Sequence, residues 1–89
     1  MGLEAVELII EIEEYFQVQI SDLEFANIYT VGDLHICLVD RLKSEKQDKF
    51  TESDAQSIWQ QVCRIVAYVA CVEPEELSSE TSFYKDLRF

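Results

Sequence analysis

The residue types that most often carry out chemistry are few in this sequence and unsuitably spaced. His35 is the only histidine, and no second histidine or cysteine stands at the spacing of a metal site. No nucleophile is placed to pair with His35, so a catalytic triad is not indicated. The 18 acidic residues are numerous, but a catalytic carboxylate pair needs burial to separate its two pKa values. We therefore expect no enzymatic activity, no metal and no cofactor.

The cysteines also fit a structural role. The chain has three cysteines, an odd number, and no two of them form a C-x-x-C pair: Cys37, Cys63 and Cys71. All three fall in helical patterns, which favours packing as small hydrophobic residues. Free thiols of this kind are typical of a reducing compartment, so the sequence predicts a cytoplasmic location.

The charge is large and unevenly distributed. Eighteen acidic residues face seven basic ones, which gives a formal net charge of −11. Residues 1–40 contain nine of the acids and no lysine or arginine. Nucleic acids and anionic membranes both require basic surface, so neither is an expected partner. A field of one sign instead favours a basic protein partner.

The elements that would position these residues are predicted to be helices. The chain has 89 residues, 48% of them hydrophobic, with two glycines and one proline. This composition suits one small all-α domain, and no alternating pattern indicates strands. Helices are expected over 2–16, about 31–42 and about 54–71, and a polar linker over 43–53.

Short signals predict where helices begin. Thr30 and Asp33 form a variant of the capping box, and Ser21 marks the start of a helical turn. Thr51 and Ser53 are both candidate N-caps for the helix after the linker. Pro74 is expected at the first position of a single turn. The expected core residues of these later segments are Val31, Leu34, Leu38, Leu42, Ile58, Val62, Ile65, Val66, Val69, Leu77, Phe83 and Leu87.

The first predicted helix has two faces. Its apolar residues recur at helical spacing and are expected to face inward: Leu3, Val6, Ile9, Ile10 and Phe16. Its acidic stripe follows the spacing i, i+3, i+7, i+10: Glu4, Glu7, Glu11 and Glu14. An ordinary solvated face mixes both signs of charge, but no base accompanies these glutamates. We interpret the stripe as a partner-binding edge.

Two stretches of the chain resemble the acyl carrier protein family. Residues 3–34, LEAVELIIEIEEYFQVQISDLEFANIYTVGDL, resemble its second half, an acidic recognition helix and a loop that ends in a T-V-G-D helix start. Residues 54–89 resemble its first half: an amphipathic helix, a V-x-P-E-E-L-like turn and then S-F-Y-K-D-L. The positions in step with the second-half pattern are Leu3, Val6, Glu7, Leu8, Glu13, Glu14, Phe16, Ile20, Asp22, Ile28, Thr30, Val31, Gly32 and Asp33.

The two halves stand in reversed order. Read with its end before its beginning, the chain gives SFYKDLRF–MGLEAVELI, which is similar to the family's SFxxDLGxDSLxxVEL. The resemblance implies a small four-helix acyl-carrier-like bundle in circularly permuted order. Residues 1–42 would run from the recognition helix to the last helix, 43–53 would link, and 54–89 would supply the first helix and following loop. Phe83 and Leu87 would then pack near Leu3 and Val6.

One position departs from the family pattern. The family attaches a phosphopantetheine arm to the serine of D-S-L, and this triplet reads Met1-Gly2-Leu3 here. Gly2 has no hydroxyl to esterify. The resemblance therefore implies the fold and the acidic recognition face, but no attached cofactor.

Two closures of the bundle remain open. In the first, residues 43–53 loop back within one chain. Eleven extended residues span up to roughly 36 Å, which is longer than a small bundle. Alternatively, the segment 54–89 of one chain completes the bundle of another, giving a domain-swapped dimer.

Three functions follow from this reading. We expect a non-catalytic carrier-like module that binds a basic protein partner through Glu4, Glu7, Glu11 and Glu14. A carrier-dependent enzyme of fatty-acid or polyketide type metabolism is the kind of partner that the resemblance implies. A genuine phosphopantetheine-dependent carrier, its serine supplied otherwise, is the first alternative. A purely structural or assembly domain is the second.

Overall fold

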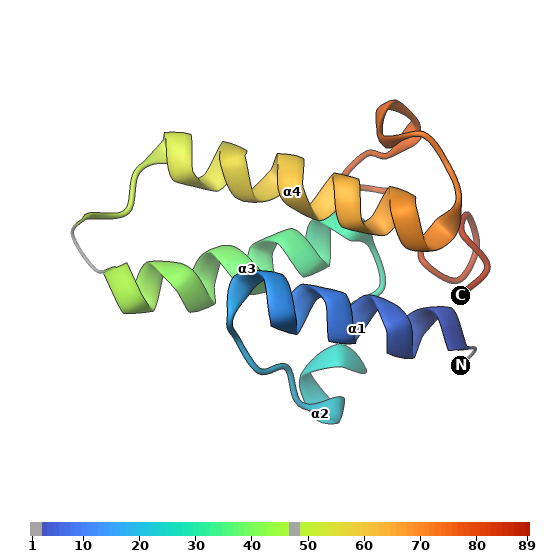
Figure 1. The fold of residues 1–89 in the computed structure, drawn as a ribbon, viewed down its shortest axis with the longest axis horizontal. Coiled ribbons are helices and arrows are strands. Elements are labelled where there is room, and N and C mark those ends of the chain that lie inside the picture. Colours follow the sequence, from blue (N-terminus) through green and yellow to red (C-terminus); the bar gives the residue numbers. More distant parts are fainter. Residues whose placement is uncertain (1–2, 47–48) are drawn as a thin grey trace.

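The chain folds into helices connected by short segments (Figure 1). The structure is a computed structural model and describes residues 3–46 and 49–89. In chain order the helices are α1 (Leu3–Phe16), α2 (Asp22–Phe25), α3 (Val31–Lys46) and α4 (Glu52–Ala70), followed by a 3-10 turn, η2 (Pro74–Glu76). This confirms the predicted all-α class.

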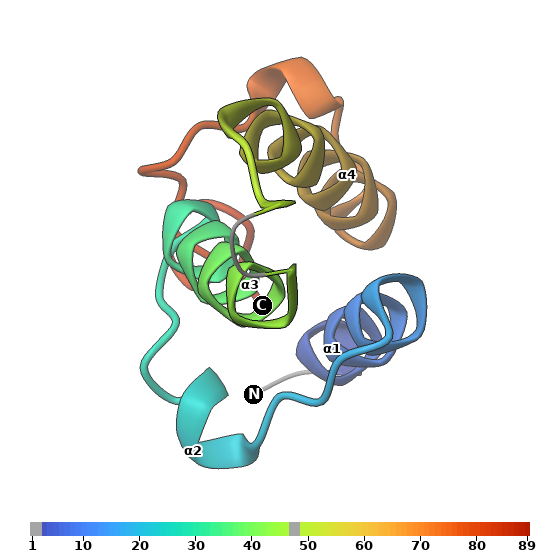
Figure 2. The ribbon, with the colours of Figure 1, turned by 90° about the vertical axis from the view of Figure 1, so that its left-hand side faces the viewer.

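The long helix α4 packs against both α3 and α1. Viewed nearly end-on, these three helices occupy the corners of a triangle, and α2 lies on the side away from α4 (Figure 2). The core lies between the three long helices. The largest side chains that are fully buried are Leu8, Ile12, Val31, Leu34, Leu38, Val62 and Val66. No described helix is long and apolar enough to cross a membrane.

The helix starts follow the predicted capping signals. Asp33 N donates to Thr30 Oγ1 at 3.1 Å, and the Asp33 carboxylate accepts from Thr30 N at 3.1 Å. Ser21 caps α2 through a capping box with Glu24. Of the two candidate caps for α4, Thr51 is used, and Asp54 completes its capping box. These predictions were correct because all hydrogen bonds of a capping box form within four consecutive residues.

The helix boundaries differ from the predicted ones around the linker. Helix α3 continues to Lys46, four residues beyond the expected end, and α4 begins at Glu52, two residues before the expected start. The connection is therefore shorter than the predicted 43–53. Residues 43–46 are polar on all sides, but lysine and glutamate are good helix formers. Polarity alone did not distinguish a solvated helix end from a loop.

The predicted inward face of α1 is partly wrong. Val6 is 54% exposed and Ile10 is 47% exposed, whereas Ala5, Leu8 and Ile12 are buried. Rows spaced by four residues explain the difference. The row of Leu8 and Ile12 continues into the half-buried Phe16, but the row of Val6 and Ile10 continues into Glu14. The apolar face is therefore rotated toward Leu8.

The C-terminal segment is bound to the start of α3. Thr30 and Ser82 form an isolated antiparallel bridge, and Gly32 N donates to the Ser79 carbonyl at 3.0 Å. A Cβ atom at position 32 would lie 2.6 Å from that carbonyl oxygen. Glycine is thus required at position 32 by close backbone approach.

The C-terminal segment also reaches the beginning of α1. Phe83 is buried, and Ala5, Phe83 and Phe89 line one shared cavity. Both ends of the described chain lie at the same end of the bundle (Figure 1). The expected contact partner Val6 points largely to solvent instead. The side chain of Leu3 lies outside what the structure describes.

Candidate functional site

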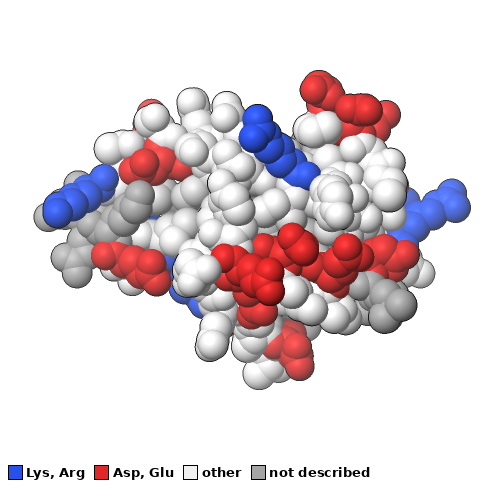
Figure 3. All heavy atoms as spheres, viewed as in Figure 1, with Lys and Arg blue, Asp and Glu red and all other residues white. Residues whose placement is uncertain are grey.

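The predicted acidic stripe lies along the outer side of α1. Glu4, Glu7 and Glu14 are exposed, whereas Glu11 is half-buried. Figure 3 shows the acidic side chains gathered into a band over this helix. The last turn of α1 contains no base. A helix C-terminus favours cations, so the acidic end of α1 is electrostatically uncompensated within its own helix.

Glu11 differs from the other three glutamates because it faces α4. It lines a small groove of about 350 Å³ together with Tyr15, Arg64 and Tyr68. Arg64 is thus a base near the stripe, supplied by a helix 53 positions further along the chain. The sequence around the stripe contains no base, so it did not indicate Arg64. Arg64 comes close to Glu11 only because α4 packs on α1 in the tertiary structure.

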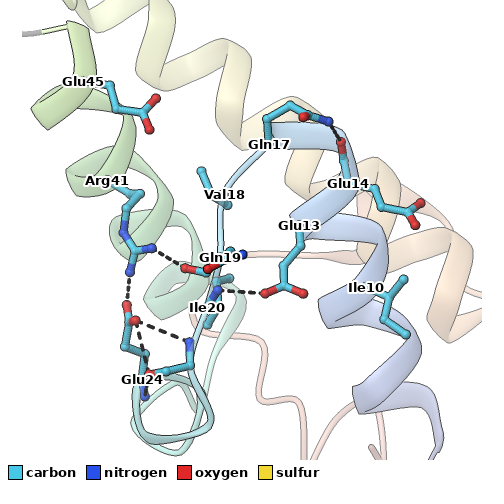
Figure 4. A pocket seen from close by; sticks show the side chains of 11 residues that line it. Ile10, Glu13, Glu14, Gln17, Val18, Gln19, Ile20, Glu24, Arg41 and Glu45 are labelled. Atoms are coloured by element: carbon cyan, nitrogen blue, oxygen red, sulfur yellow. Dashed lines mark hydrogen bonds and ion pairs between the residues drawn. The ribbon is translucent and has the colours of Figure 1, made fainter.

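A larger groove runs along the other side of α1, toward α2 and α3. It encloses about 1060 Å³, and Ile10, Glu13, Glu24, Arg41 and Glu45 are among its lining residues. Figure 4 shows carboxylates from three elements around it, with Glu14 at its rim pointing away from α3. The groove therefore combines an apolar edge with a surplus of acidic groups.

The single arginine of this groove is already engaged. The Arg41 guanidinium donates to the Gln19 carbonyl and to the Glu24 carboxylate (Figure 4). The hydrogen bond from Arg41 lowers the pKa of Glu24 below its ordinary value, and the bond from Ser21 N adds to this shift. Arg41 therefore ties the loop before α2 to α3 instead of offering a free cation.

Glu13 holds the same loop from the α1 side. Its Oε2 accepts from Ile20 N at 2.8 Å. The loop is thus fixed at both ends of the groove: Glu13 binds it from α1 and Arg41 binds it from α3. These bonds from α1 and α3 hold the loop in place and so define the walls of the groove.

A mostly apolar cavity lies near the start of α1. It encloses about 770 Å³ between α1, the segment that follows α2 and the C-terminal segment. Phe25, Ile28, Phe83 and Phe89 are among its lining residues, and the Phe83 and Phe89 rings stack with centroids 5.5 Å apart. Tyr29 and Tyr84 also line it and are largely exposed.

The residues present do not fit an attached phosphopantetheine arm. Gly2, at the position that the resemblance assigns to the attachment serine, has no hydroxyl, and it lies outside the described residues. Ser82 lines the apolar cavity, but its hydroxyl accepts a bond from Lys85 N as part of a turn.

Most of the remaining reactive residue types lie in structural positions. Cys71 is the exception: it was expected to pack as a small hydrophobic residue, but it is exposed at the C-cap of α4. His35 Nε2 is 2.9 Å from the Ala55 carbonyl oxygen, and its ring meets Trp59 edge-on, so it joins α3 to α4. Burial raises the pKa of the Cys37 and Cys63 thiols. Within residues 3–46 and 49–89, no group of three or more His, Cys, Asp or Glu residues could hold a metal ion.

Val6 and Ile10, which were predicted to face the core, are exposed, and the sequence predicted no role for Arg41 or Glu45 at the surface. A signal for the first error exists, because the row of Val6 and Ile10 ends in Glu14. No local signal predicts Arg41, since its partners lie 17 and 22 positions away. Comparisons with protein-family models, curated proteins and solved structures gave no match.

Proposed function

We propose that this chain is a non-catalytic, acyl-carrier-like module in circularly permuted order that binds a protein partner through α1. The acidic band along α1 is the observation that carries the proposal. The band belongs to a helix without a compensating base in its last turn. Such a surface attracts a basic partner and speeds their encounter.

The arrangement of the chain ends supports the permuted order. The resemblance requires that the end of the chain lead into the start of α1. Consistent with this, Ala5 of α1 and Phe83 and Phe89 of the C-terminal segment line the same cavity. The T-V-G-D start of α3 binds the segment that precedes S-F-Y-K-D-L, through Gly32 N and the Ser79 carbonyl.

The partner in this proposal is an enzyme that normally meets carrier proteins. The module would occupy, regulate or scaffold that enzyme without carrying an acyl group. Association rates with purified carrier-dependent enzymes, measured by surface plasmon resonance over a range of salt, test this proposal. The variant Glu7→Lys/Glu14→Lys should associate several-fold more slowly at low salt and with a flatter salt response.

A matched control separates a specific edge from overall charge. Asp40→Lys/Glu75→Lys changes the net charge equally at exposed positions outside α1. If both variants associate equally slowly, the band acts only through the net charge of the protein. If the association rate of the α1 variant is unchanged, the band is a solvated surface that does not bind the partner.

A genuine acyl carrier is the second candidate, favoured by the apolar cavity of about 770 Å³ beside α1. Gly2 argues against it, because no hydroxyl is present there. Incubation with a phosphopantetheinyl transferase and coenzyme A, followed by intact-mass measurement, should leave the mass unchanged. A gain equal to the mass of the arm would favour this second candidate.

A further inference from the structure

Two exposed aliphatic residues of α1 lie beside the large groove. Val6 and Ile10 are one turn apart on the same face, and Ile10 lines the groove directly. Both side chains are about half exposed, at 54% and 47%. They form a short apolar ridge of the kind that packs between side chains of a second helix. Two residues are too few for tight association without additional polar contacts.

The groove next to this ridge favours a cation. Glu13, Glu24 and Glu45 surround it, and the only base among its lining residues, Arg41, is engaged by Glu24 and the Gln19 carbonyl. The groove also receives the C-terminal end of α1, whose last turn contains no base. Arg41 offsets the charge of Glu24, so the negative potential comes from Glu13, Glu45 and the helix terminus.

Resting on the proposed function, we propose that the element docking on α1 is a basic amphipathic helix of the partner protein. Its apolar edge covers Val6 and Ile10, and a lysine or arginine beside that edge enters the groove that α1, α2 and α3 line. A second copy of this chain is a poor occupant, because it would bring another net charge of −11 to an acidic surface. The binding footprint thus extends from the stripe toward Glu45.

A synthetic peptide provides the probe. A helix of about 18 residues with leucines on one edge and arginines beside them is titrated into the isotope-labelled protein and followed by NMR. We expect saturable binding, with the largest shift changes at Ile10, Glu13, Gln19 and Glu24. Changes centred on Tyr15 and Tyr68, or no saturable binding, would overturn the proposal.

Two protein variants test the two halves of the contact. Ile10→Ser should weaken the peptide about fivefold, whereas Ile36→Ser, which changes another exposed isoleucine, should not. Glu45→Lys should weaken it about threefold at low salt, whereas Glu75→Lys should not. Equal effects of a variant and its control would contradict the proposed footprint. Far-ultraviolet circular dichroism verifies that each variant is folded.

Peptide variants keep the test independent of protein folding. Replacing the peptide's leucines by serine, or its arginines by glutamate, should abolish binding. A proline-containing peptide of the same composition should bind far more weakly, and equal binding would overturn the helical occupant. The outcome is separable from that of the proposed function. Carrier-dependent enzymes that bind α1 while the peptide does not would overturn only this inference.

Discussion

At the scale of single residues, the closest constraint is the contact of Gly32 with the C-terminal segment. Replacing a glycine by alanine inside a helix usually stabilises the helix by up to about 1 kcal/mol. In Gly32→Ala, however, the added Cβ would lie 2.6 Å from the Ser79 carbonyl oxygen, and a backbone atom cannot yield cheaply. We therefore predict a loss of about 1–3 kcal/mol in the free energy of unfolding, measured with urea.

The exposed Gln56→Ala on α4 provides a reference for this substitution. It adds a good helix former at an exposed position and should leave stability equal or slightly higher. If Gly32→Ala behaves like Gln56→Ala, the approach of Ser79 to α3 is not as close as described.

Glu24 gives a residue-scale prediction for pH. The bond from Arg41, reinforced by Ser21 N, lowers the pKa of Glu24 from its ordinary value of 4.5. Because the folded pKa is the lower one, this contribution to stability is complete above pH 4.5 and is lost as the pH falls through the folded pKa. An NMR titration should place the pKa of Glu24 below 4.5 in the natural chain and closer to it in Arg41→Met.

The same titration of Arg41→Lys serves as the comparison. Lysine retains the charge but lacks the planar guanidinium that lets Arg41 donate to the Gln19 carbonyl and the Glu24 carboxylate together. An intermediate pKa is expected. If all three chains give one value, Arg41 does not hold Glu24.

At the scale of elements, the rotated face of α1 is open to direct measurement. Leu8 and Ile12 are fully buried, so Leu8→Ala or Ile12→Ala should each cost about 2–5 kcal/mol in the free energy of unfolding. Val6→Ala and Ile10→Ala should each cost less than about 1 kcal/mol, because these side chains are half exposed. Chemical denaturation of the four variants gives the comparison. The opposite order of effects would restore the face that the sequence predicted.

At the scale of the whole molecule, charge repulsion dominates the response to salt. A net charge of −11 destabilises the compact state, so added sodium chloride should raise the thermal midpoint. Glu7→Lys/Glu14→Lys changes the charge by four, to −7, and should raise stability at low salt by tenths of a kcal/mol. Its salt response should be smaller. Calorimetry over a salt series measures both effects.

The permuted order is also testable on the whole molecule. We predict that a rearranged chain, opened between residues 48 and 49 and with residue 89 joined to residue 1 by a short glycine-serine linker, folds to the same bundle. The C-terminal segment and α1 already line a common cavity, so little backbone must be added. Circular dichroism and a cooperative urea transition provide the readout. A chain opened inside α4, between Gln61 and Val62, is the control that should not fold.

Several properties followed from the amino-acid sequence because they depend on neighbours along the chain. The capping boxes at Thr30 and Ser21 are each complete within four residues, and the stripe of glutamates needs only the period of a helix. The all-α class and the acidic surface also follow from the composition and the periodicity of the chain, without any knowledge of tertiary contacts.

Other properties were decided by tertiary packing. Which apolar row of α1 is buried depends on where α4 lies, because two rows of similar hydrophobicity competed for that position. Arg41 reaches Glu24 across 17 positions, Arg64 approaches Glu11 from another helix, and Gly32 is required by Ser79. These contacts join residues that are distant in sequence, so no local pattern specifies them. The groove beside α1 exists because such contacts fix its walls.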